Sequence, residues 1–247
     1  MTAVGLAPQR VTRPTLIAPR RRLGVLVAVL MGLAGFTALA LSLVGTNAET
    51  GPDTAVDEWL FSHVGFRTAT VMLGLSEPKV TTSILVLVVL AAGLARRWDA
   101  VVWAVIAPTL AIVLAEVVFK PLVGRRLVVD LTEDPYYATH RPPGGVTLVA
   151  ARGYAFPSGH ETGVTAVTVE LALLALLVPM ARRLRAALLV VLALWTLIAA
   201  AGLVRNHYHF ATDTLGAILL TAACVAGVAL ATDAVGERRR RGRAQFT

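Results

Sequence analysis

Hydrophobic residues gather in six long runs along the chain, separated by short polar stretches. Most runs approach the ~20 residues that an α-helix needs to cross the hydrocarbon core of a bilayer. The second run is the shortest, and its helix is expected to begin a few residues earlier, near Ser76. We predict an all-α, polytopic membrane bundle whose six transmembrane helices are Leu23–Val44, Val80–Ala95, Val101–Phe119, Thr162–Met180, Ala186–Val204 and Thr214–Ala231.

Composition supports a membrane protein, because 56% of the residues are hydrophobic and only 15% are charged. A soluble fold could not bury so much apolar surface. The first run follows Arg20–Arg22 and could also be read as a signal peptide. Its apolar stretch is longer than a signal-peptide core, and no small-x-small cleavage site follows, so we favour an uncleaved first helix.

Clusters of arginine predict the orientation. With six crossings, four clusters fall on one face of the membrane, which the positive-inside rule makes cytoplasmic. Both termini are then inside, and the loops after the first, third and fifth spans face outward. The net charge of +8 follows from this topology and from contact with anionic lipids, so the arginine-rich end is not a nucleic-acid site. The clusters are Arg20–Arg22, Arg96–Arg97, Arg182–Arg185 and Arg238–Arg243.

The pattern divides the chain into three parts. Residues 1–22 are expected to be a disordered basic cytoplasmic tail, residues 23–231 the six-span domain, and residues 232–247 a second basic cytoplasmic tail. After the first span, Val56–Val64 has apolar residues at helical spacing and is expected to lie flat at the membrane interface. The single Cys224 falls within the sixth span, which excludes a disulfide framework.

Three polar clusters emerge on the predicted outer face. Lys120 ends the third span, Pro157-Ser-Gly-His160 precedes the fourth, and His207-Tyr-His209-Phe-Ala-Thr-Asp213 precedes the sixth. Arginines also lie outside, against the positive-inside bias, and an anionic ligand is the simplest reason for them. These arginines are Arg125, Arg126, Arg141, Arg152 and Arg205.

Ser158 and Glu161 have the spacing of a capping box at the start of the fourth span. Capping is compatible with function, because a helix N-terminus that includes Gly159 presents free N–H groups to a phosphate. His160, an imidazole at the mouth of a hydrophobic span, suits proton transfer to a leaving oxygen. We favour a helix cap that is also part of a site.

Three interpretations are open for the second histidine cluster. It could be an interfacial loop in which Thr212 or Asp213 caps the sixth span, or a metal site that also uses His160. Against a metal, His207 and His209 would share a side only in an extended strand. In the third interpretation, Asp213 orients His209 from four residues away and leaves the other ring nitrogen as a nucleophile. We favour the nucleophile.

Lys120, Arg125 and Arg126 could be ordinary interfacial residues that extend towards the headgroups. Their position on the outer side favours a second interpretation, because phosphoryl transfer gains most from fixed positive charge around the equatorial oxygens. Arg205, at the end of the fifth span, could add a further charge.

At these residues the chain resembles the type 2 phosphatidic acid phosphatase superfamily, which also includes bacterial prenyl-diphosphate phosphatases and vanadium haloperoxidases. The family pattern is Lys, six residues, Arg-Pro; then Pro-Ser-Gly-His; then Ser-Arg, five residues, His, three residues, Asp. The resemblance covers the third to sixth spans. Lys120, Pro157–His160, His209 and Asp213 match the pattern.

Two parts of the family pattern are displaced in this chain. Leu127-Val128 stand where the pattern has Arg-Pro, and Gly202-Leu203 stand where it has Ser-Arg. Arg125 or Arg126 is expected to replace the first arginine from a loop. Arg205 is expected to replace the second, since on a continuing helix it would share a face with His209, four residues on.

The resemblance implies a lipid phosphatase that needs no metal or other cofactor. His209, oriented by Asp213, would attack phosphorus to form a phosphohistidine. His160 would protonate the leaving oxygen and then activate water. The groups implied to bind the phosphate oxygens are Lys120, Arg125, Arg126, Ser158, Gly159 and Arg205.

The expected substrate is an amphiphile whose phosphate enters from the outer face while its tail stays in the lipid. Candidates are prenyl (di)phosphates, phosphatidate and phosphatidylglycerol phosphate. The bias towards Ala, Val, Leu and Arg suggests a GC-rich bacterium, hence a plasma-membrane protein and a role in envelope synthesis. The rival is a non-catalytic lipid-phosphate binder or transporter. A haloperoxidase is disfavoured because those relatives are soluble.

Overall fold

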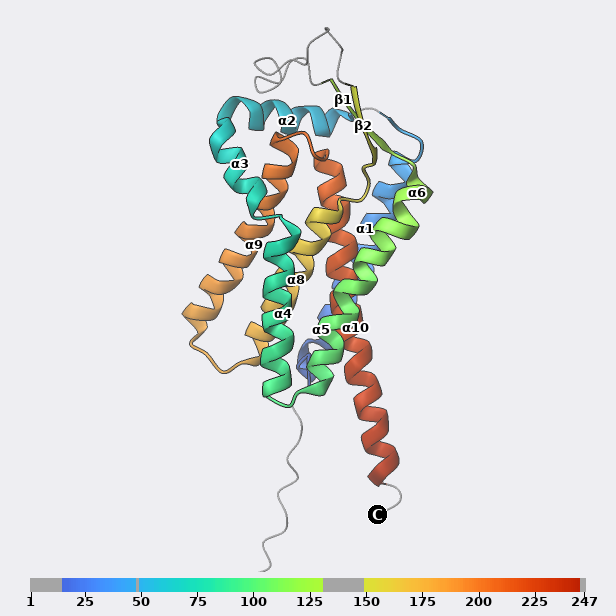
Figure 1. Cartoon of the computed structure of the whole chain (residues 1–247). Coiled ribbons are helices and arrows are strands. Elements are labelled where there is room, and N and C mark those ends of the chain that lie inside the picture. The colour runs from blue at the N-terminus through green and yellow to red at the C-terminus, as the bar shows by residue number, and fades with distance from the viewer. Residues whose placement is uncertain (1–14, 48, 131–148, 245–247) are drawn as a thin grey trace, which may run out of the picture.

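The computed structural model describes residues 15–47, 49–130 and 149–244 of the chain. Helices dominate and form an elongated bundle (Figure 1). In chain order the elements are η1 (Pro19–Arg21), α1 (Arg22–Leu43), α2 (Gly51–His63), α3 (Phe66–Gly74), α4 (Pro78–Leu94), α5 (Trp98–Val113), η2 (Leu114–Phe119), α6 (Lys120–Val123), β1 (Arg126–Asp130), β2 (Val149–Tyr154), α8 (Gly159–Leu177), α9 (Arg182–Arg205) and α10 (Ala211–Ala244).

Six helical stretches within these residues are long and apolar enough to cross a membrane, which confirms the predicted number. The second joins α3 to α4, and the third runs without a break through α5, η2 and α6. The stretches are Pro19–Leu43, Phe66–Leu94, Trp98–Val123, Gly159–Leu177, Arg182–Arg205 and Ala211–Arg239. The α4 helix begins at Pro78, because proline suits the first turn, where an N–H has no partner.

The interior of the bundle is built around α8 and α10. The α10 helix packs against α1, α5 and α8, and the Trp103 indole of α5 donates to Val225 O of α10 at 3.0 Å. Phe36 of α1 stacks on Phe156 at a ring-centroid distance of 5.6 Å and meets Phe119 edge-on at 4.6 Å. These aromatic contacts hold the end of η2 beside the loop that leads into α8.

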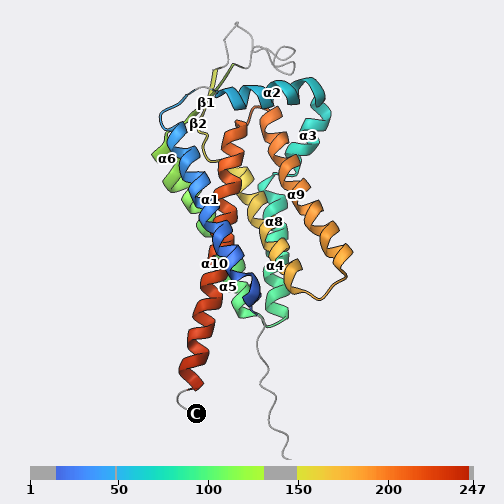
Figure 2. The ribbon, with the colours of Figure 1, turned by 180° about the vertical axis from the view of Figure 1, so that it is seen from behind.

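The α2 helix and a two-stranded hairpin lie at the end of the bundle next to this loop (Figures 1 and 2). The α2 helix lies across this end (Figure 1). The strands β1 and β2 pair antiparallel with Arg126 opposite Tyr154, although the sequence predicted no strand. The helix expected over Val56–Val64 is part of α2, and its Trp59 and Phe61 side chains are exposed. A position of α2 at the membrane interface stays a prediction.

The structure describes part of each predicted tail. Residues 1–14 lie outside the described part of the chain, but Leu16 and Ile17 are buried rather than disordered. Their N–H groups donate to the Asp233 carboxylate at 2.7 and 2.8 Å. The second predicted tail continues α10 as far as Ala244, since its residues between Asp233 and that point include no proline.

The helix ends fall into two groups at opposite ends of the bundle (Figures 1 and 2). The start of α1, the turn from α4 to α5, the turn from α8 to α9 and the end of α10 lie together, away from α2 and the hairpin. The four basic clusters flank these helix ends in the sequence. Which side of a membrane they face remains the prediction from the positive-inside rule.

Candidate active site

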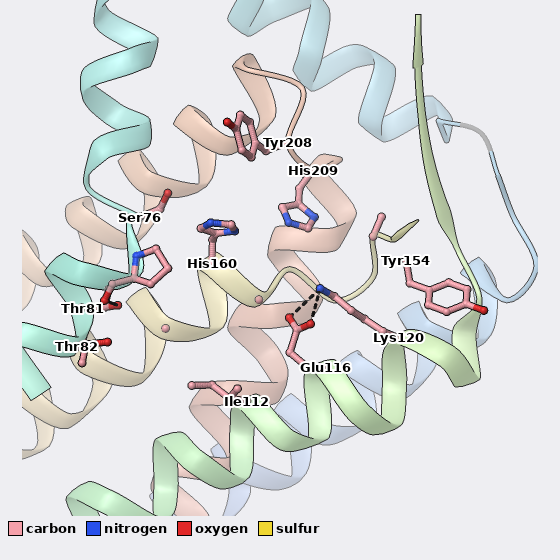
Figure 3. Close-up of a pocket in the computed structure, with 14 residues that line it drawn as sticks. Ser76, Thr81, Thr82, Ile112, Glu116, Lys120, Tyr154, His160, Tyr208 and His209 are labelled. Atoms are coloured by element: carbon pink, nitrogen blue, oxygen red, sulfur yellow. Dashed lines mark hydrogen bonds and ion pairs between the residues drawn. The ribbon is translucent and has the colours of Figure 1, made fainter. Parts of the chain in front are cut away.

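A cavity of about 570 Å³ lies between α4, η2, α8 and the turn before α10 (Figure 3). It brings together residues from all three polar clusters of the sequence. Its lining residues are Ser76, Pro78, Thr81, Thr82, Ile112, Glu116, Lys120, Tyr154, Ala155, Gly159, His160, Gly163, Tyr208 and His209.

The Ser158 side chain caps α8. Its Oγ accepts from the Glu161 N–H at 3.3 Å, and the hydroxyl is fully buried. The predicted capping box is half formed, because the Ser158 N–H donates to Asp213 O at 3.1 Å instead of to Glu161. Ser158 therefore fixes the start of α8 against α10, while its neighbours Gly159 and His160 line the cavity.

The turn between α9 and α10 sets the position of His209. The α9 helix ends at Arg205, and His207 takes the left-handed conformation at φ 53°. The N–H groups of His207 and Tyr208 return to the carbonyls of Val204 and Leu203 at 2.8 and 2.9 Å. This is the hydrogen-bond pattern of a Schellman helix end. The helix expected to place Arg205 and His209 on one face is therefore interrupted.

His160 and His209 face the same space (Figure 3), with their ring centroids 6.3 Å apart. His209 Nδ1 lies 3.7 Å from Asp213 Oδ2, which is longer than a hydrogen bond. Among the residues that the structure describes, this nitrogen has no hydrogen-bond partner. Catalytic hydrogen bonds are often long in the free enzyme and shorten in the substrate complex.

His207 does not line the cavity. It is the residue after α9 whose backbone takes the left-handed conformation. The metal interpretation required it to join His209 and further ligands. Among the described residues, no group of three or more His, Cys, Asp or Glu side chains could hold a metal ion.

Lys120 extends into the cavity from the first residue of α6, directly after η2. Its ammonium donates to both oxygens of Glu116, at 2.7 and 2.8 Å. The Glu116 carboxylate also packs against the first residue of α8, because a Cβ at Gly159 would collide with Glu116 Oε1. Glu116 lies in the π-helical turn η2, a distortion that is frequent at functional sites.

Arg125 does not line the cavity, contrary to its predicted role in binding phosphate. Its guanidinium is fully buried and donates to Asp213 Oδ1 at 2.8 Å and to Asp53 Oδ2 at 2.7 Å. It also donates to Thr212 Oγ1 and lies over the Phe210 ring. Arg125 is held away from the cavity because its guanidinium forms ion pairs with two buried carboxylates. It supports the site by holding Asp213 in place.

Asp53 brings α2 into this network. Its Oδ1 accepts from the Thr212 N–H at 2.8 Å, and its Oδ2 also accepts from Thr50. Burial alone would raise the pKa of this carboxyl, but the hydrogen bonds from Arg125, Thr212 and Thr50 outweigh burial and hold the pKa below its usual value. Asp53 is therefore an ionised partner of Arg125.

The other two candidate arginines do not line the cavity either. Arg126 is exposed on β1, with its guanidinium carbon 6.0 Å from the ring centre of Tyr154, which does line the cavity. Arg205 is buried at the end of α9, where Nε donates to Val64 O at 3.0 Å and the guanidinium stacks on Phe61. Arg141 lies outside the described residues, and nothing is described of the Arg152 side chain.

Gly202 and Leu203, at the second displaced part of the family pattern, have packing roles. Leu203 is fully buried. Gly202 brings α9 against α3 so closely that a Cβ would collide with the backbone of Met72 and Leu73. A polar Ser-Arg pair at these two positions would have to fit into a packed helix interface.

Sequence reasoning missed Glu116 and Asp53. Glu116 had a signal, because its spacing of four from Lys120 is that of an ion pair on a helix. For Asp53 the sequence contains only a local signal, the spacing of a capping box with Thr50. Nothing in the sequence links it to Arg125, 72 residues away.

Comparison with known proteins agrees with this arrangement. A family model described as the PAP2 superfamily matches residues 100–236, from α5 into α10. A solved structure of the first transmembrane PAP2 type phosphatidylglycerolphosphate phosphatase from Bacillus subtilis is similar in fold. It is 20% identical in sequence, the match covers 81% of this chain and 94% of that chain, and the TM-score is 0.61. A comparison with curated proteins finds no match. The chain belongs to the PAP2 superfamily and has the fold of a PAP2-type membrane phosphatase.

Proposed function

We propose that this protein is an integral-membrane lipid phosphatase that works through a phosphohistidine intermediate. The observation that carries the proposal is the convergence of Lys120, His160 and His209 on one cavity at the N-terminus of α8. A lysine ammonium and helix N–H groups suit a phosphate, and two imidazoles provide a nucleophile and a proton donor.

In the first step, His209 Nε2 attacks phosphorus, because Nδ1 is the ring nitrogen beside Asp213. A P–N bond forms, the bond from phosphorus to the lipid oxygen breaks, and protonated His160 gives its proton to that oxygen. Asp213 stabilises the positive charge that develops on His209. In the second step, His160 takes a proton from water, the hydroxide attacks phosphorus, and the P–N bond breaks to release phosphate and His209.

The fixed positive groups are Lys120 and the N–H end of α8. Arg126 does not line the cavity and lies beside the lining residue Tyr154. Ser158 and Arg125 act indirectly in this proposal, by holding α8 and Asp213. Arg205 acts still further away, by fixing α2 to α9.

An amphiphilic substrate is supported by the lining of the cavity. From Lys120 the lining continues to Ile112 on the same span, and to Thr81 and Thr82 on α4. A phosphate at the histidines therefore has its tail directed along membrane-spanning helices. We propose prenyl (di)phosphates, phosphatidate or phosphatidylglycerol phosphate, hydrolysed at the extracytoplasmic face of a bacterial plasma membrane.

The test is phosphate release from these lipids by the purified full-length protein in detergent. We expect release with at least one of them, inhibition by vanadate, and unchanged turnover in EDTA, because the mechanism needs no metal. Abolition of turnover by EDTA would contradict the metal-independent mechanism. Release that survives in His209→Ala would contradict the phosphohistidine.

A second candidate is a non-catalytic lipid-phosphate binder or transporter on the same scaffold. One observation favours it: no arginine is among the described residues that line the cavity, so Lys120 alone supplies permanent positive charge there. Saturable binding of the same lipids without any phosphate release would favour this candidate.

A further inference from the structure

The Glu116 carboxylate occupies the place where an incoming phosphate would bind. Both of its oxygens accept from the Lys120 ammonium, the permanent cation among the described lining residues. The carboxylate also lies against Gly159, at the positive end of the α8 helix. An anion between a lysine and a helix N-terminus is in the position that suits a phosphate oxygen.

Glu116 also offsets the positive charge of Lys120 in the cavity. Apart from the two histidines, the described lining residues carry one positive charge, from Lys120, and one negative charge, from Glu116. Its side chain is 39% exposed, so the carboxylate has room to move away. A phosphate therefore meets an occupied lysine and has to displace a resident anion.

From this arrangement we propose that Glu116 determines specificity by selecting phosphates that carry more than one negative charge. The proposal rests on the phosphatase function proposed above. A phosphomonoester carries about 1.5 to 2 negative charges at pH 7 and a diphosphate carries more, so either gains by replacing one carboxylate on Lys120. A phosphodiester headgroup brings a single charge and gains no net charge attraction by the same exchange. Glu116 thus keeps the phosphodiester lipids of the surrounding membrane out of the site.

The experiment compares wild type with Glu116→Gln, which keeps the shape of the side chain and removes its charge. Binding of short-chain dihexanoyl phosphatidylglycerol, a phosphodiester that should not be hydrolysed, is measured by calorimetry on the full-length protein. We expect the substitution to lower the dissociation constant by roughly tenfold, equivalent to about 1.4 kcal/mol. We also expect phosphatidylglycerol to become a stronger inhibitor of phosphate release from dihexanoyl phosphatidate.

The control is Glu58→Gln, which removes a carboxylate from the exposed face of α2 and should leave both values as in wild type. Glu116→Ala is a second variant with the same expected direction. An unchanged affinity for phosphatidylglycerol in folded Glu116→Gln protein, with or without turnover, would overturn the proposal. Loss of folding in both Glu116 variants would also overturn it, because the carboxylate would then be structural.

The same measurements separate this inference from the proposed function. If wild type releases no phosphate from any lipid, the phosphatase is rejected and this role of Glu116 with it. If wild type releases phosphate and Glu116→Gln binds phosphatidylglycerol no more tightly, only the role of Glu116 is rejected.

Discussion

Replacing Arg125 with methionine should strongly lower the free energy of unfolding, because Arg125 pairs with two buried carboxylates. The guanidinium is 0% exposed and pairs with Asp53 and Asp213, which are 1% and 0% exposed. Removing one partner of a buried ion pair typically costs about 3–5 kcal/mol, because the remaining charge stays buried and unpaired. Arg125→Met leaves two such carboxylates, so we expect a loss at the upper end of this range.

The assay is thermal unfolding in detergent, followed by tryptophan fluorescence and by size-exclusion chromatography of heated samples. For a chain of this size each kcal/mol moves the midpoint by roughly 2–4 °C, so a loss of about 5 kcal/mol in Arg125→Met should lower the midpoint by roughly 10–20 °C. The matched control is Arg126→Met, one residue on. Its exposed cation–π contact is worth about 0.5–1 kcal/mol, which predicts a shift of at most roughly 4 °C.

A double variant tests the cause. Asp53→Asn added to Arg125→Met removes one of the two uncompensated charges, so the combined loss should be smaller than the sum of the two single losses. Equal midpoints for Arg125→Met and Arg126→Met would refute the buried-pair reasoning. Strict additivity of Arg125→Met and Asp53→Asn would refute the coupling between the two side chains.

Three further predictions follow from the geometry. His209→Ala should lower phosphate release by several orders of magnitude, whereas His207→Ala, at the end of α9, should stay within a few-fold of wild type; equal losses would reject the assignment. The pKa of Asp53 is depressed in the folded state, so its contribution to stability is present above its unfolded pKa of about 3.9 and is lost as the pH falls through the folded pKa. On acidification below about pH 4, the unfolding midpoint of wild type should therefore fall further than that of Asp53→Asn. An equal fall of the two midpoints would contradict this. Gly202→Val should lower stability by roughly 1–3 kcal/mol through its clash with the α3 backbone, seen as a lower unfolding midpoint; an unchanged midpoint would show that α3 can move away.

Most of the helices could be predicted well because their hydrophobic runs are long and continuous, so that length alone identifies them. Their ends were less certain. The end of α10 was placed at Ala231, where the apolar run stops, but arginine and glutamate continue a helix as readily as leucine does. The hairpin strands were not predicted, because their pairing depends on contacts between segments rather than on local pattern.

The site could be predicted in part, because residues close together in a motif have a fixed local geometry. Pro157–His160 and the segment from His209 to Asp213 were located in this way. The placement of Arg125 could not be predicted, since the side chain that holds it, Asp53, belongs to a distant helix. Spacing alone does not distinguish an arginine that meets substrate from one that meets a buried carboxylate.

The contact of Leu16 and Ile17 with Asp233 has a consequence for how the molecule is made. The α1 helix is synthesised before α10, yet the segment at its start is bound by Asp233 of α10, 217 residues from Leu16. Contacts between such distant parts of a chain form late, because a long loop must close before they bring any gain. The contact that joins α1 to α10 can therefore form only after all the helices between them have been synthesised.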